Sequence, residues 1–406
     1  MKKEVKKVPQ LRFPEFTGDW EQRKLNEITD VRDGTHDSPK YVQEGHPFIT
    51  SKNVSNGFID YNDIQYVTDE DYDAINKRSK VDVHDILMGM IGTIGNLALI
   101  RKEPDFAIKN VALIKYTGDI DYQYLYQALQ ADCVTRQLST GMDGGTQKFV
   151  SLKKIRELDI PFPKEYEQQK IGVYFSKLDN LITLHQRKLE KIKKFKKGVM
   201  QKLFSQEVRF KADDGSDFPE WEEKKLGKVA DIYDGVHQTP EYVSSGVKFV
   251  SVENIESIYS TNKYITQKAF ERDYKNNIPK KWDILMTRIG DVGRVALIDD
   301  DEQLAYYVSL ALIRVSSDFV PQFFVQALRS DFFQAELWRN MLHTAYPKKI
   351  NKQDIGKCKV KFPVSIAEQQ KIADCLSALD EVIEKQKATL AVWEELKKGL
   401  LQQMFV

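Results

Sequence analysis

Two copies of a short polar motif hold the residues of this chain whose types and spacing could do chemistry. The motif reads DGTHDSP at residues 33–39 and DGVHQTP at residues 234–240, so His36 and His237 stand at the same place in each copy. Each histidine either bonds to the backbone of a turn or contacts a ligand or a phosphate. The sequence alone leaves both interpretations open.

Motifs of catalysis and cofactor binding are absent from the sequence. No GxxxxGK[ST] loop is present, and none of the six histidines has HExxH spacing, so neither nucleotide hydrolysis nor a catalytic metal is indicated. Gly89, Gly92 and Gly95 lack the spacing of a dinucleotide fingerprint. The three cysteines lack CxxC spacing, which argues against a zinc site and a disulfide framework. We therefore expect a chain that is not an enzyme and has no cofactor or metal of its own.

The composition is that of a folded protein whose charge is local. The 406 residues are 41% hydrophobic and 30% charged with a net charge of +1, so contact with nucleic acid must come from basic patches. The densest patch, residues 185–202, has eight Lys or Arg against one Glu, and a solvated helix face is its alternative interpretation. The apolar run 86–100 is too short to span a membrane and no segment resembles a targeting signal. We expect a cytoplasmic protein without membrane contact.

The elements that must position these motifs come from an internal duplication. Residues 20–42 and 221–243 agree at eleven of 23 positions, at an offset of 221 − 20 = 201. Unrelated segments of that length would share roughly one or two positions, so a domain has been duplicated. The match continues at a nearly constant offset through EQQKI at residues 167–171 and 368–372 to KKG at residues 196–198 and 397–399.

Each copy is predicted to contain a mixed globular segment followed by a long helix. Strands are predicted at residues 46–50 and 247–251 and again at 158–163 and 358–363; helices are predicted at 121–138 and 321–341, and short helices begin after Ser151 and Asn351. The predicted fold class is α+β, with two similar mixed α/β domains joined by two long helices. The predicted boundaries are a first domain at 1–165, a spacer helix at 166–206, a second domain at 207–364 and a C-terminal helix at 365–406.

The long helices carry a heptad pattern that predicts a coiled coil. The predicted seam consists of Ile171, Leu178, His185, Ile192 and Val199 in the first helix, and of Ile372, Leu379, Gln386, Trp393 and Leu400 in the second. An isolated helix cannot bury such a stripe, so the equivalent helix is its natural partner, and the connections require an antiparallel pair. Ser365 and Glu368 predict a capping box at the start of the second helix. At 1.5 Å per residue the pair would be a rod on the order of 55 Å, a molecular ruler with a domain at each end.

These segments resemble the specificity subunit of type I restriction-modification systems. The resemblance rests on FPEF…WEQRKL and its duplicate FPEW…WEEKKL, which overlap at Trp221, on the DGxH…P…YV turns, on the loop 144–148 before Ser151, and on EQQKI at the start of each long helix. It covers the whole chain. Each motif is weak by itself, whereas their order, repeated twice with an alternating helix, is specific.

The resemblance implies a non-catalytic subunit of a larger complex. Two target-recognition domains would each bind one half of a split site in double-stranded DNA, while the antiparallel coiled coil sets the gap and docks two methyltransferase subunits. Restriction/translocase subunits would join this assembly, and the methyl donor and ATP would be bound by the partners. Each domain would present one adenine, which the methyltransferase flips from the stack.

The duplication also predicts where DNA specificity lies. The frame segments agree between copies but residues 54–83 and 255–281 diverge, as expected when two domains share phosphate contacts and read different bases; drift of surface loops is the alternative. Lys148 and Lys348 align as shared phosphate contacts, although residues 343–347 replace the glycines of loop 144–148. Arg288 and Arg294 either read guanine or pair with Asp283 or Asp291. The predicted DNA-binding residues are Thr35, His36, Ser38, Tyr41, Lys52, Asn53, Thr146, Gln147 and Lys148 in the first copy and His237, Gln238, Thr239, Tyr242, Asn254, Arg288, Arg294, Tyr346, Lys348 and Lys349 in the second.

Two other functions remain open at this point. One is a single-chain nuclease or methyltransferase, which would turn over DNA without partners. The other is a coiled-coil scaffold that binds only protein, in which case the basic run at 185–202 is a solvated face.

Overall fold

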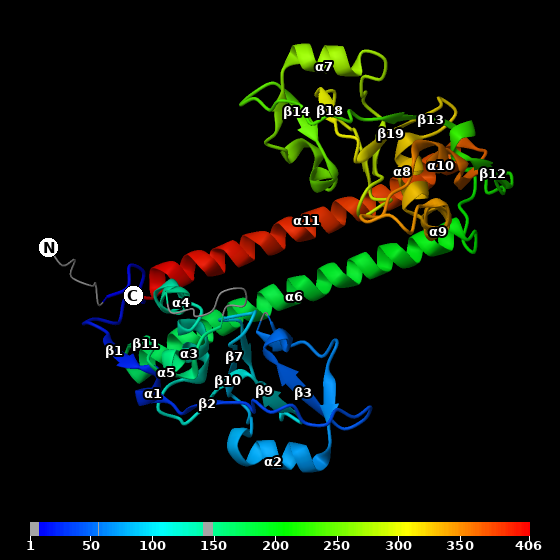
Figure 1. The fold of residues 1–406 in the computed structure, drawn as a ribbon. Helices are drawn as coiled ribbons and strands as arrows, with labels where there is room; N and C mark the ends of the chain where they lie inside the picture. Colours follow the sequence, from blue (N-terminus) through cyan, green and yellow to red (C-terminus); the bar gives the residue numbers. More distant parts are fainter. Residues whose placement is uncertain (1–7, 56, 141–148) are drawn as a thin grey trace. The chain divides into compact units, whose positions relative to one another are not determined.

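A computed structural model describes residues 8–55, 57–140 and 149–406 (Figure 1). Its contacts divide the chain into two compact units, which we call unit 1 (Met1–Gln186 with Ala388–Val406) and unit 2 (Arg187–Lys387). Each unit therefore contains a part of both long helices. The boundaries predicted from the sequence instead treat the two long helices as segments separate from the domains. Those boundaries stay a prediction.

The described part of unit 1 contains a four-stranded sheet, a three-stranded sheet, the two-stranded pairs β1-β11 and β4-β5, and a set of short helices. Its strands are β1 (Glu21–Lys24), β2 (Val31–Asp33), β3 (His46–Thr50), β4 (Val54–Ser55), β5 (Phe58–Ile59), β6 (Gln65–Val67), β7 (Ile86–Gly89), β8 (Leu97–Leu99), β9 (Ala107–Lys109), β10 (Val111–Ile114) and β11 (Asp159–Phe162). Its helices are α1 (Leu25–Ile28), η1 (Ser51–Asn53), α2 (Asp69–Ser79), α3 (Tyr122–Ala128), α4 (Asp132–Ser139), α5 (Leu152–Arg156) and the first part of α6 (Glu165–Phe204).

Unit 2 repeats this order of elements. Its strands are β12 (Trp221–Lys225), β13 (Ala230–Asp234), β14 (Val247–Val250), β15 (Tyr264–Ile265), β16 (Ile284–Thr287), β17 (Val295–Leu297), β18 (Leu304–Tyr306), β19 (Leu310–Val315) and β20 (Lys359–Pro363). Its helices are η2 (Leu226–Lys228), η3 (Val252–Asn254), η4 (Ile258–Ser260), α7 (Gln267–Tyr274), α8 (Pro321–Arg329), α9 (Asp331–Asn340), α10 (Lys352–Lys357) and the first part of α11 (Ile366–Met404).

The sheets of the two units have the same topology. In unit 1 a four-stranded antiparallel sheet has the order β2-β10-β7-β8, and a three-stranded sheet has the order β6-β3-β9, with β3 and β9 parallel. In unit 2 the corresponding orders are β13-β19-β16-β17 and β15-β14-β18. The predicted class of two similar mixed α/β domains is confirmed.

The central strand of each large sheet lies between two apolar layers, which accounts for the repeated sequence DILM. Ile86 and Met88 of β7 pack in the same cluster as the α3, α4 and α6 side chains, whereas Leu87 packs on the other face against Ile49 and Ile108 of the small sheet. The alternation follows from the two-residue period of a strand. In unit 2 the residues of β16 alternate in the same way.

Each of the helices predicted at residues 121–138 and 321–341 is divided into two shorter helices in the structure. The chain breaks between α3 and α4 at residues 129–131, and between α8 and α9 at Ser330. The Ser330 hydroxyl accepts a hydrogen bond from the Phe333 amide, so it caps the second helix and turns the chain. Pro321 stands in the first turn of α8, and Ser151 caps α5, both as predicted, whereas Asn351 opens α10 without a side-chain cap.

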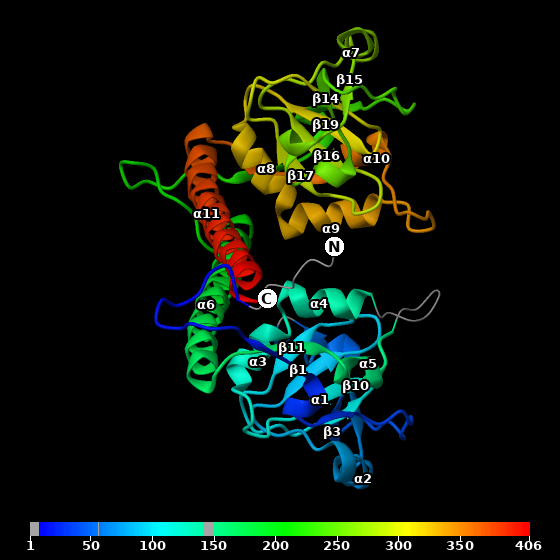
Figure 2. The same cartoon turned by 90° about the vertical axis from the view of Figure 1, so that its left-hand side faces the viewer.

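The segments that diverge between the copies build comparable elements of different size. Residues 54–83 form β4, β5, β6 and the eleven-residue α2, whereas residues 255–281 form η4, β15 and the eight-residue α7. Figure 2 shows α2 beyond β3 in unit 1 and α7 beyond β14 and β15 in unit 2. The largest difference is the β4–β5 pair, which η4 replaces.

Within each unit, the parts of α6 and α11 that belong to it run antiparallel. In unit 1, Asp179 contacts Lys397 and Gln186 contacts Glu394. Residue numbers in α11 therefore decrease as those in α6 increase, which is the order of an antiparallel pair. In unit 2, Lys196 contacts Asp380, and further along α6 Leu203 packs in one cluster with Ile372. A second row of positions, seven residues apart, joins the predicted seam; in α6 it consists of Phe175, Ile182, Leu189, Lys196 and Leu203, all buried.

Candidate DNA-binding surface

The DGxH turn of unit 1 is organised around a buried carboxylate. Asp33 ends β2 and is 6% exposed; its carboxylate accepts hydrogen bonds from Nε2 of His36 at 2.9 Å and from Arg78 of α2. Nδ1 of His36 lies 2.7 Å from Oδ1 of Asn110. Hydrogen bonds to Asn110 and to Asp33 raise the pKa of His36, because both acceptors favour the protonated ring.

His36 therefore bonds to side chains. A histidine bonded to the backbone of its turn, one of the two interpretations of the sequence, is not what the structure shows. The His36 side chain is 63% exposed. A ring that is held by two acceptors and also open to solvent places a positive charge at the surface when it is protonated.

The same turn in unit 2 uses its carboxylate differently. Asp234 pairs with Arg288, and Nζ of Lys352 lies 4.0 Å away. The place of Asn110 is taken by Ser309, whose hydroxyl accepts a hydrogen bond from the Val252 amide. One carboxylate on a common scaffold thus holds a different cation in each unit.

The pairing predicted for Arg288 is wrong. Its partner is Asp234, because the Asp283 carboxylate is occupied by the guanidinium of Arg314 at 2.6 and 2.8 Å. Arg294 pairs with Glu256 and lies 3.7 Å from Asp291.

A second turn lies beside the DGxH turn in each unit. In unit 1 the Ser51 hydroxyl donates to the Asn110 carbonyl at 2.6 Å and accepts from the Met90 amide at 3.0 Å, which joins η1 to β7 and to the residue after β9. Asn53 is 2% exposed. Its side-chain carboxamide accepts a hydrogen bond from the Thr50 backbone amide and donates one to the Asp60 carbonyl. Asn53 thus shapes this turn, and its burial does not favour the DNA contact predicted for it.

The glycines after β7 and β16 form tight hairpin turns. Gly92 and Gly95 have φ angles of 72° and 80°, and Gly290 and Gly293 have angles of 85° and 101°, a region that favours glycine. At Gly89 a Cβ atom would lie 2.4 Å from the Thr93 carbonyl oxygen. These glycines are structural and form no phosphate loop.

The loop before α5 or α10 joins this hairpin turn. Phe149 forms a bridge to Ile91 in unit 1, and Lys349 forms one to Ile289 in unit 2, where the Gly290 amide also donates to the Lys348 carbonyl at 2.8 Å. Thr146, Gln147 and Lys148 lie outside the described residues, so their predicted role stays a prediction. In unit 2 the chain does place Lys348 and Lys349 beside the turn that carries Arg288.

Most of the predicted DNA-binding residues that the structure describes are exposed. The exposed ones are His36, Ser38, Tyr41, Lys52, His237, Gln238, Thr239, Tyr242, Tyr346, Lys348 and Lys349. Thr35, Asn254, Arg288 and Arg294 are half-buried. Some are engaged by neighbours: Nζ of Lys52 lies 2.9 Å from Asp63, and Nζ of Lys109 lies 2.6 Å from the Ser38 hydroxyl.

Trp338 belongs to the same surface of unit 2 and was missed from the sequence. Its side chain is 53% exposed on α9; the His343 ring lies 4.5 Å from it, and Nζ of Lys348 lies 4.5 Å above it. The available signal is a tryptophan on the polar face of an amphipathic helix. An exposed aromatic ring beside cations can stack on a base or a sugar.

The repeated EQQKI motif turns out to fasten each long helix to its domain. Glu167 is 1% exposed and forms two hydrogen bonds with Arg12, at 2.7 and 2.8 Å. The next residue, Gln168, donates to the Pro163 carbonyl at 2.8 Å and accepts from the Asp121 amide at 3.0 Å, which joins the end of β11 to the start of α3.

Unit 2 repeats this arrangement, and it refutes the predicted capping box. Glu368 is fully buried; its carboxylate bonds to Arg209 at 2.9 and 3.1 Å and to the Trp221 indole at 3.2 Å. It is therefore engaged by the domain and does not cap α11 with Ser365. Gln369 bonds to the Pro363 carbonyl and the Val320 amide, as Gln168 does to their counterparts.

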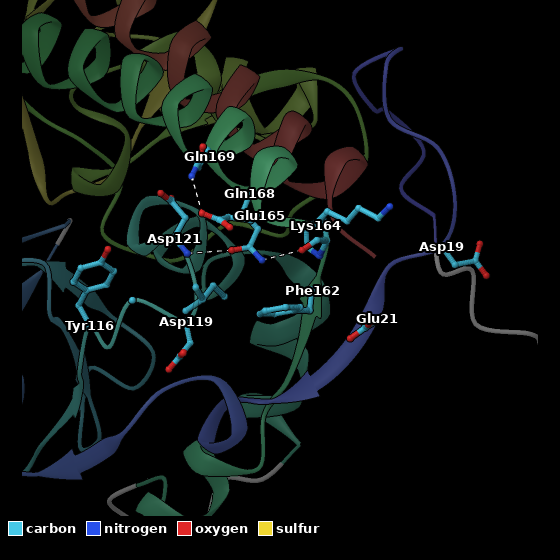
Figure 3. Close-up of a pocket in the computed structure, with 13 residues that line it drawn as sticks. Asp19, Glu21, Tyr116, Asp119, Asp121, Phe162, Lys164, Glu165, Gln168 and Gln169 are labelled. Carbon is cyan, nitrogen blue, oxygen red and sulfur yellow. Dashed lines mark hydrogen bonds between the residues drawn. The ribbon is translucent and has the colours of Figure 1, made fainter.

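A pocket of about 400 Å³ lies beside this fastening in unit 1 (Figure 3). Among the residues that line it are five carboxylates, those of Asp19, Glu21, Asp119, Asp121 and Glu165. None of the predicted DNA-binding residues lines it, and its acidic character would repel phosphate. The pocket is not part of the candidate DNA-binding surface.

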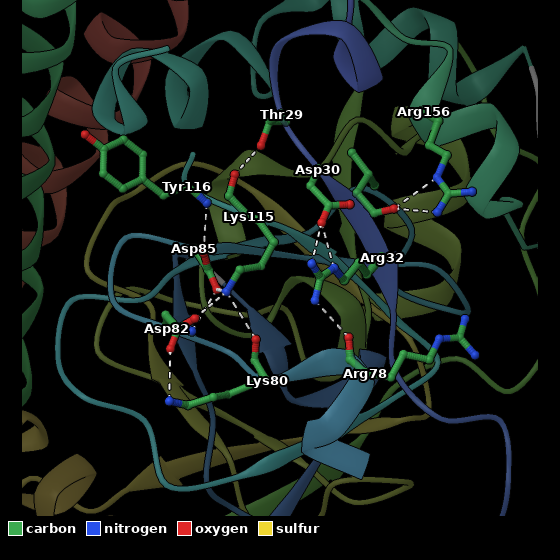
Figure 4. A network of polar contacts seen from close by, with 11 residues as sticks. Thr29, Asp30, Arg32, Arg78, Lys80, Asp82, Asp85, Lys115, Tyr116 and Arg156 are labelled. Carbon is green, nitrogen blue, oxygen red and sulfur yellow. Dashed lines mark hydrogen bonds and ion pairs between the residues drawn. The ribbon is translucent and has the colours of Figure 1, made fainter. Parts of the chain in front are cut away.

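A polar network joins the residue after β10 to the turn before β7, at one end of the two inner strands of the large sheet (Figure 4). Nζ of Lys115 lies 2.6 Å from both Asp82 and the buried Asp85. Burial lowers the pKa of Lys115, but the hydrogen bonds to these carboxylates outweigh it and raise the pKa overall. The hydrogen bond from Lys115 lowers the pKa of Asp82. The pair of Arg314 with Asp283 takes the corresponding place in unit 2.

Neither the cysteines nor metal-binding clusters point to a reaction centre in the described part of the chain. Burial raises the pKa of Cys133 to about 11 and that of Cys358 to about 12, so these thiols stay protonated and poorly nucleophilic. The described residues contain no group of three or more His, Cys, Asp or Glu that could hold a metal ion. Of the helices described, none is long and apolar enough to cross a membrane.

Two segments of the chain match one protein family. Residues 17–194 and 219–392 each match the family described as the type I restriction modification DNA specificity domain. The chain belongs to this family. The two matches coincide with the two copies of the duplication.

Known specificity subunits are similar to the chain over nearly its whole length. The type I restriction enzyme MjaVIII specificity subunit of Methanocaldococcus jannaschii is 26% identical over 98% of this chain and 93% of its own length. The putative MjaX specificity subunit of the same organism is 26% identical over 95% and 93%. The crystal structure of the type I restriction-modification system S subunit from M. genitalium has a TM-score of 0.63 at 16% identity, covering 98% of this chain and 99% of that one, which shows a shared fold.

Proposed function

We propose that this chain is the DNA-specificity subunit of a type I restriction-modification complex, in which each unit recognises one half of a bipartite site. One observation carries the proposal: the two units build the same polar surface on the same frame from different side chains. The buried carboxylate of Asp33 holds His36 and Arg78 in unit 1, and the half-buried carboxylate of Asp234 holds Arg288 in unit 2. A shared frame with exchanged side chains is what two readers of different base sequences need.

The catalytic steps belong, in this proposal, to other subunits. Two methyltransferase subunits would bind the methyl donor and flip the target adenine, and restriction/translocase subunits would bind ATP. Exposed apolar side chains on the long helices support docking of a protein partner. They include Leu184 and Phe195 on α6, each 62% exposed, and Val392 on α11, 66% exposed.

The test is adenine methylation by the reconstituted complex. The chain is combined with methyltransferase subunits of its own system and incubated with labelled methyl donor and a library of DNA duplexes. We expect methylation at one split motif, with an adenine in each half. Methyl transfer by the chain alone would indicate an enzyme, and a complex that forms but shows no DNA selectivity would indicate a scaffold that binds only protein.

A further inference from the structure

Each part of the α6–α11 pair has one lysine in its buried seam. In unit 2, Lys196 is 8% exposed, and its Nζ lies 2.5 Å from Oδ1 of Asp380 on the other helix. In unit 1, Nζ of Lys397 lies 2.8 Å from Oδ1 of Asp179. Because 397 − 196 = 201 and 380 − 179 = 201, the two pairs are copies of each other.

A glutamine from the globular part of the unit completes each pair. In unit 2 the Gln326 carboxamide donates to Asp380 at 3.0 Å and lies 3.3 Å from Nζ of Lys196. In unit 1 the Gln127 carboxamide donates to Asp179 at 2.7 Å. Both glutamines are almost fully buried, at 3% and 1% exposed. Each cluster thus joins α6, α11 and the first helix after the sheets, and we call it a clamp.

The clamps differ at one position. Gln130 in unit 1 accepts from Nζ of Lys397 at 2.8 Å, whereas Arg329 in unit 2 lies 3.5 Å from the Asp380 carboxylate. Burial lowers the pKa of Lys196, and the nearby Arg329 adds to this, while the pair with Asp380 opposes it. The aspartate is therefore what keeps a charged lysine tolerable inside the seam.

The apolar seam by itself would accept a slip of one heptad, because apolar residues would again face apolar residues. The clamps oppose such a slip. A slip of seven residues replaces Asp380 by Ala373 or Lys387 beside Lys196, which leaves a buried charge unpaired. The same slip replaces Asp179 by Gly172 or Gln186 beside Lys397.

We propose that these two clamps are positioning residues that fix the register of the helix pair and, with it, the gap between the half-sites. The inference rests on the proposed function. Because each clamp also holds its domain, the helix residues between the clamps set the gap. The clamp positions lie 196 − 179 = 17 residues apart in α6 and 397 − 380 = 17 residues apart in α11.

The experiment uses the complex with its methyltransferase subunits and a pool of duplexes that carry both half-sites at a series of gap lengths. One variant replaces both pairs by apolar residues: Lys196→Met with Asp380→Leu, and Lys397→Met with Asp179→Leu. We expect unchanged half-sites and helix content, and at least a tenfold weaker preference for the parental gap over its neighbours. The matched control is Lys193→Met with Glu190→Leu, an exposed pair within α6 that should leave the preference unchanged.

A reversed pair keeps the test valid if the apolar variant folds poorly. Lys196→Asp with Asp380→Lys should keep the parental gap, whereas Lys196→Asp alone should broaden it. A gap preference as sharp as the parental one in a folded apolar variant would overturn the inference and leave the proposed function intact. A parental complex without any split-site preference would refute the proposed function, and the inference with it.

Discussion

At the scale of single residues, carboxylates with low exposure hold cationic side chains in two different settings. Asp33 and Asp234 hold cations at the candidate DNA-binding surface, whereas Glu167 and Glu368 hold the arginines that anchor the segment entering each domain. Apart from His36, the cations of both groups come from distant parts of the sequence. Asp33 and Asp234 thus position charge at the candidate DNA-binding surface, and Glu167 and Glu368 connect separate segments of the fold.

The raised pKa of His36 depends first on Asn110. Asn110→Ser, which introduces the residue found at the corresponding position of unit 2, should bring the pKa of His36 back toward its ordinary range, as measured by NMR titration of the ring. Since the pKa is raised on folding, the stabilisation by protonated His36 is complete below its unfolded value of about 6.5 and is lost as the pH rises through the folded value. If the Asn110→Ser ring titrates as the parental one does, the contact has no such role.

The Glu167 carboxylate is expected to be essential for the stability of unit 1. Glu167→Gln leaves the mostly buried Arg12 guanidinium without its partner and should lower the free energy of unfolding by about 3 kcal/mol, measured by urea denaturation. Glu165→Gln, two residues earlier at an exposed position of the same helix turn, is the control and should change stability by less than about 0.5 kcal/mol. Equal effects of the two variants would contradict the fastening role.

At the scale of elements, a duplicated frame carries segments that are free to differ. The sheets of both units have one topology, while β4 and β5 in unit 1 are replaced by η4 in unit 2. The frame holds its shape through its own contacts, including Lys115 with Asp85 and Arg314 with Asp283.

Exchange of the first domain should alter one half-site alone. A chimaera that carries residues 1–165 of another family member should methylate a site whose first half is new and whose second half and gap are unchanged. The measurement is adenine methylation mapped over a genome or a random library. A change in both halves would show that the two units do not recognise DNA independently.

Much of this organisation could be predicted from the sequence, because the repeat exposes what is shared. The offset of 201 residues gives two domains, and the seven-residue spacing of apolar side chains gives the helix seam. The breaks at 129–131 and Ser330 were missed, because one apolar face continues through them. The capping box at Ser365 was wrong, since tertiary pairing with Arg209 takes its glutamate. The ion-pair partners of Arg288 and Glu167 could not be predicted, because they lie 54 and 155 positions away in the sequence.

At the scale of the whole molecule, the proposed function depends on two readers held at a fixed separation along DNA. The antiparallel contacts within each unit and the repeated clamps supply a means of fixing it. Docked methyltransferases would then act on two adenines whose separation is set by the helices. The length of helix between the clamps becomes the quantity that determines the gap.

Removal of one heptad from both helices tests this claim most directly. Deleting residues 186–192 together with residues 387–393 keeps the seam pattern and both clamps, and removes seven residues between them in each helix. At 1.5 Å per helix residue and 3.4 Å per base pair, the preferred gap should shorten by about three base pairs while both half-sites stay the same. An unchanged gap, or a change in either half-site, in a complex that still folds and methylates DNA would contradict the account.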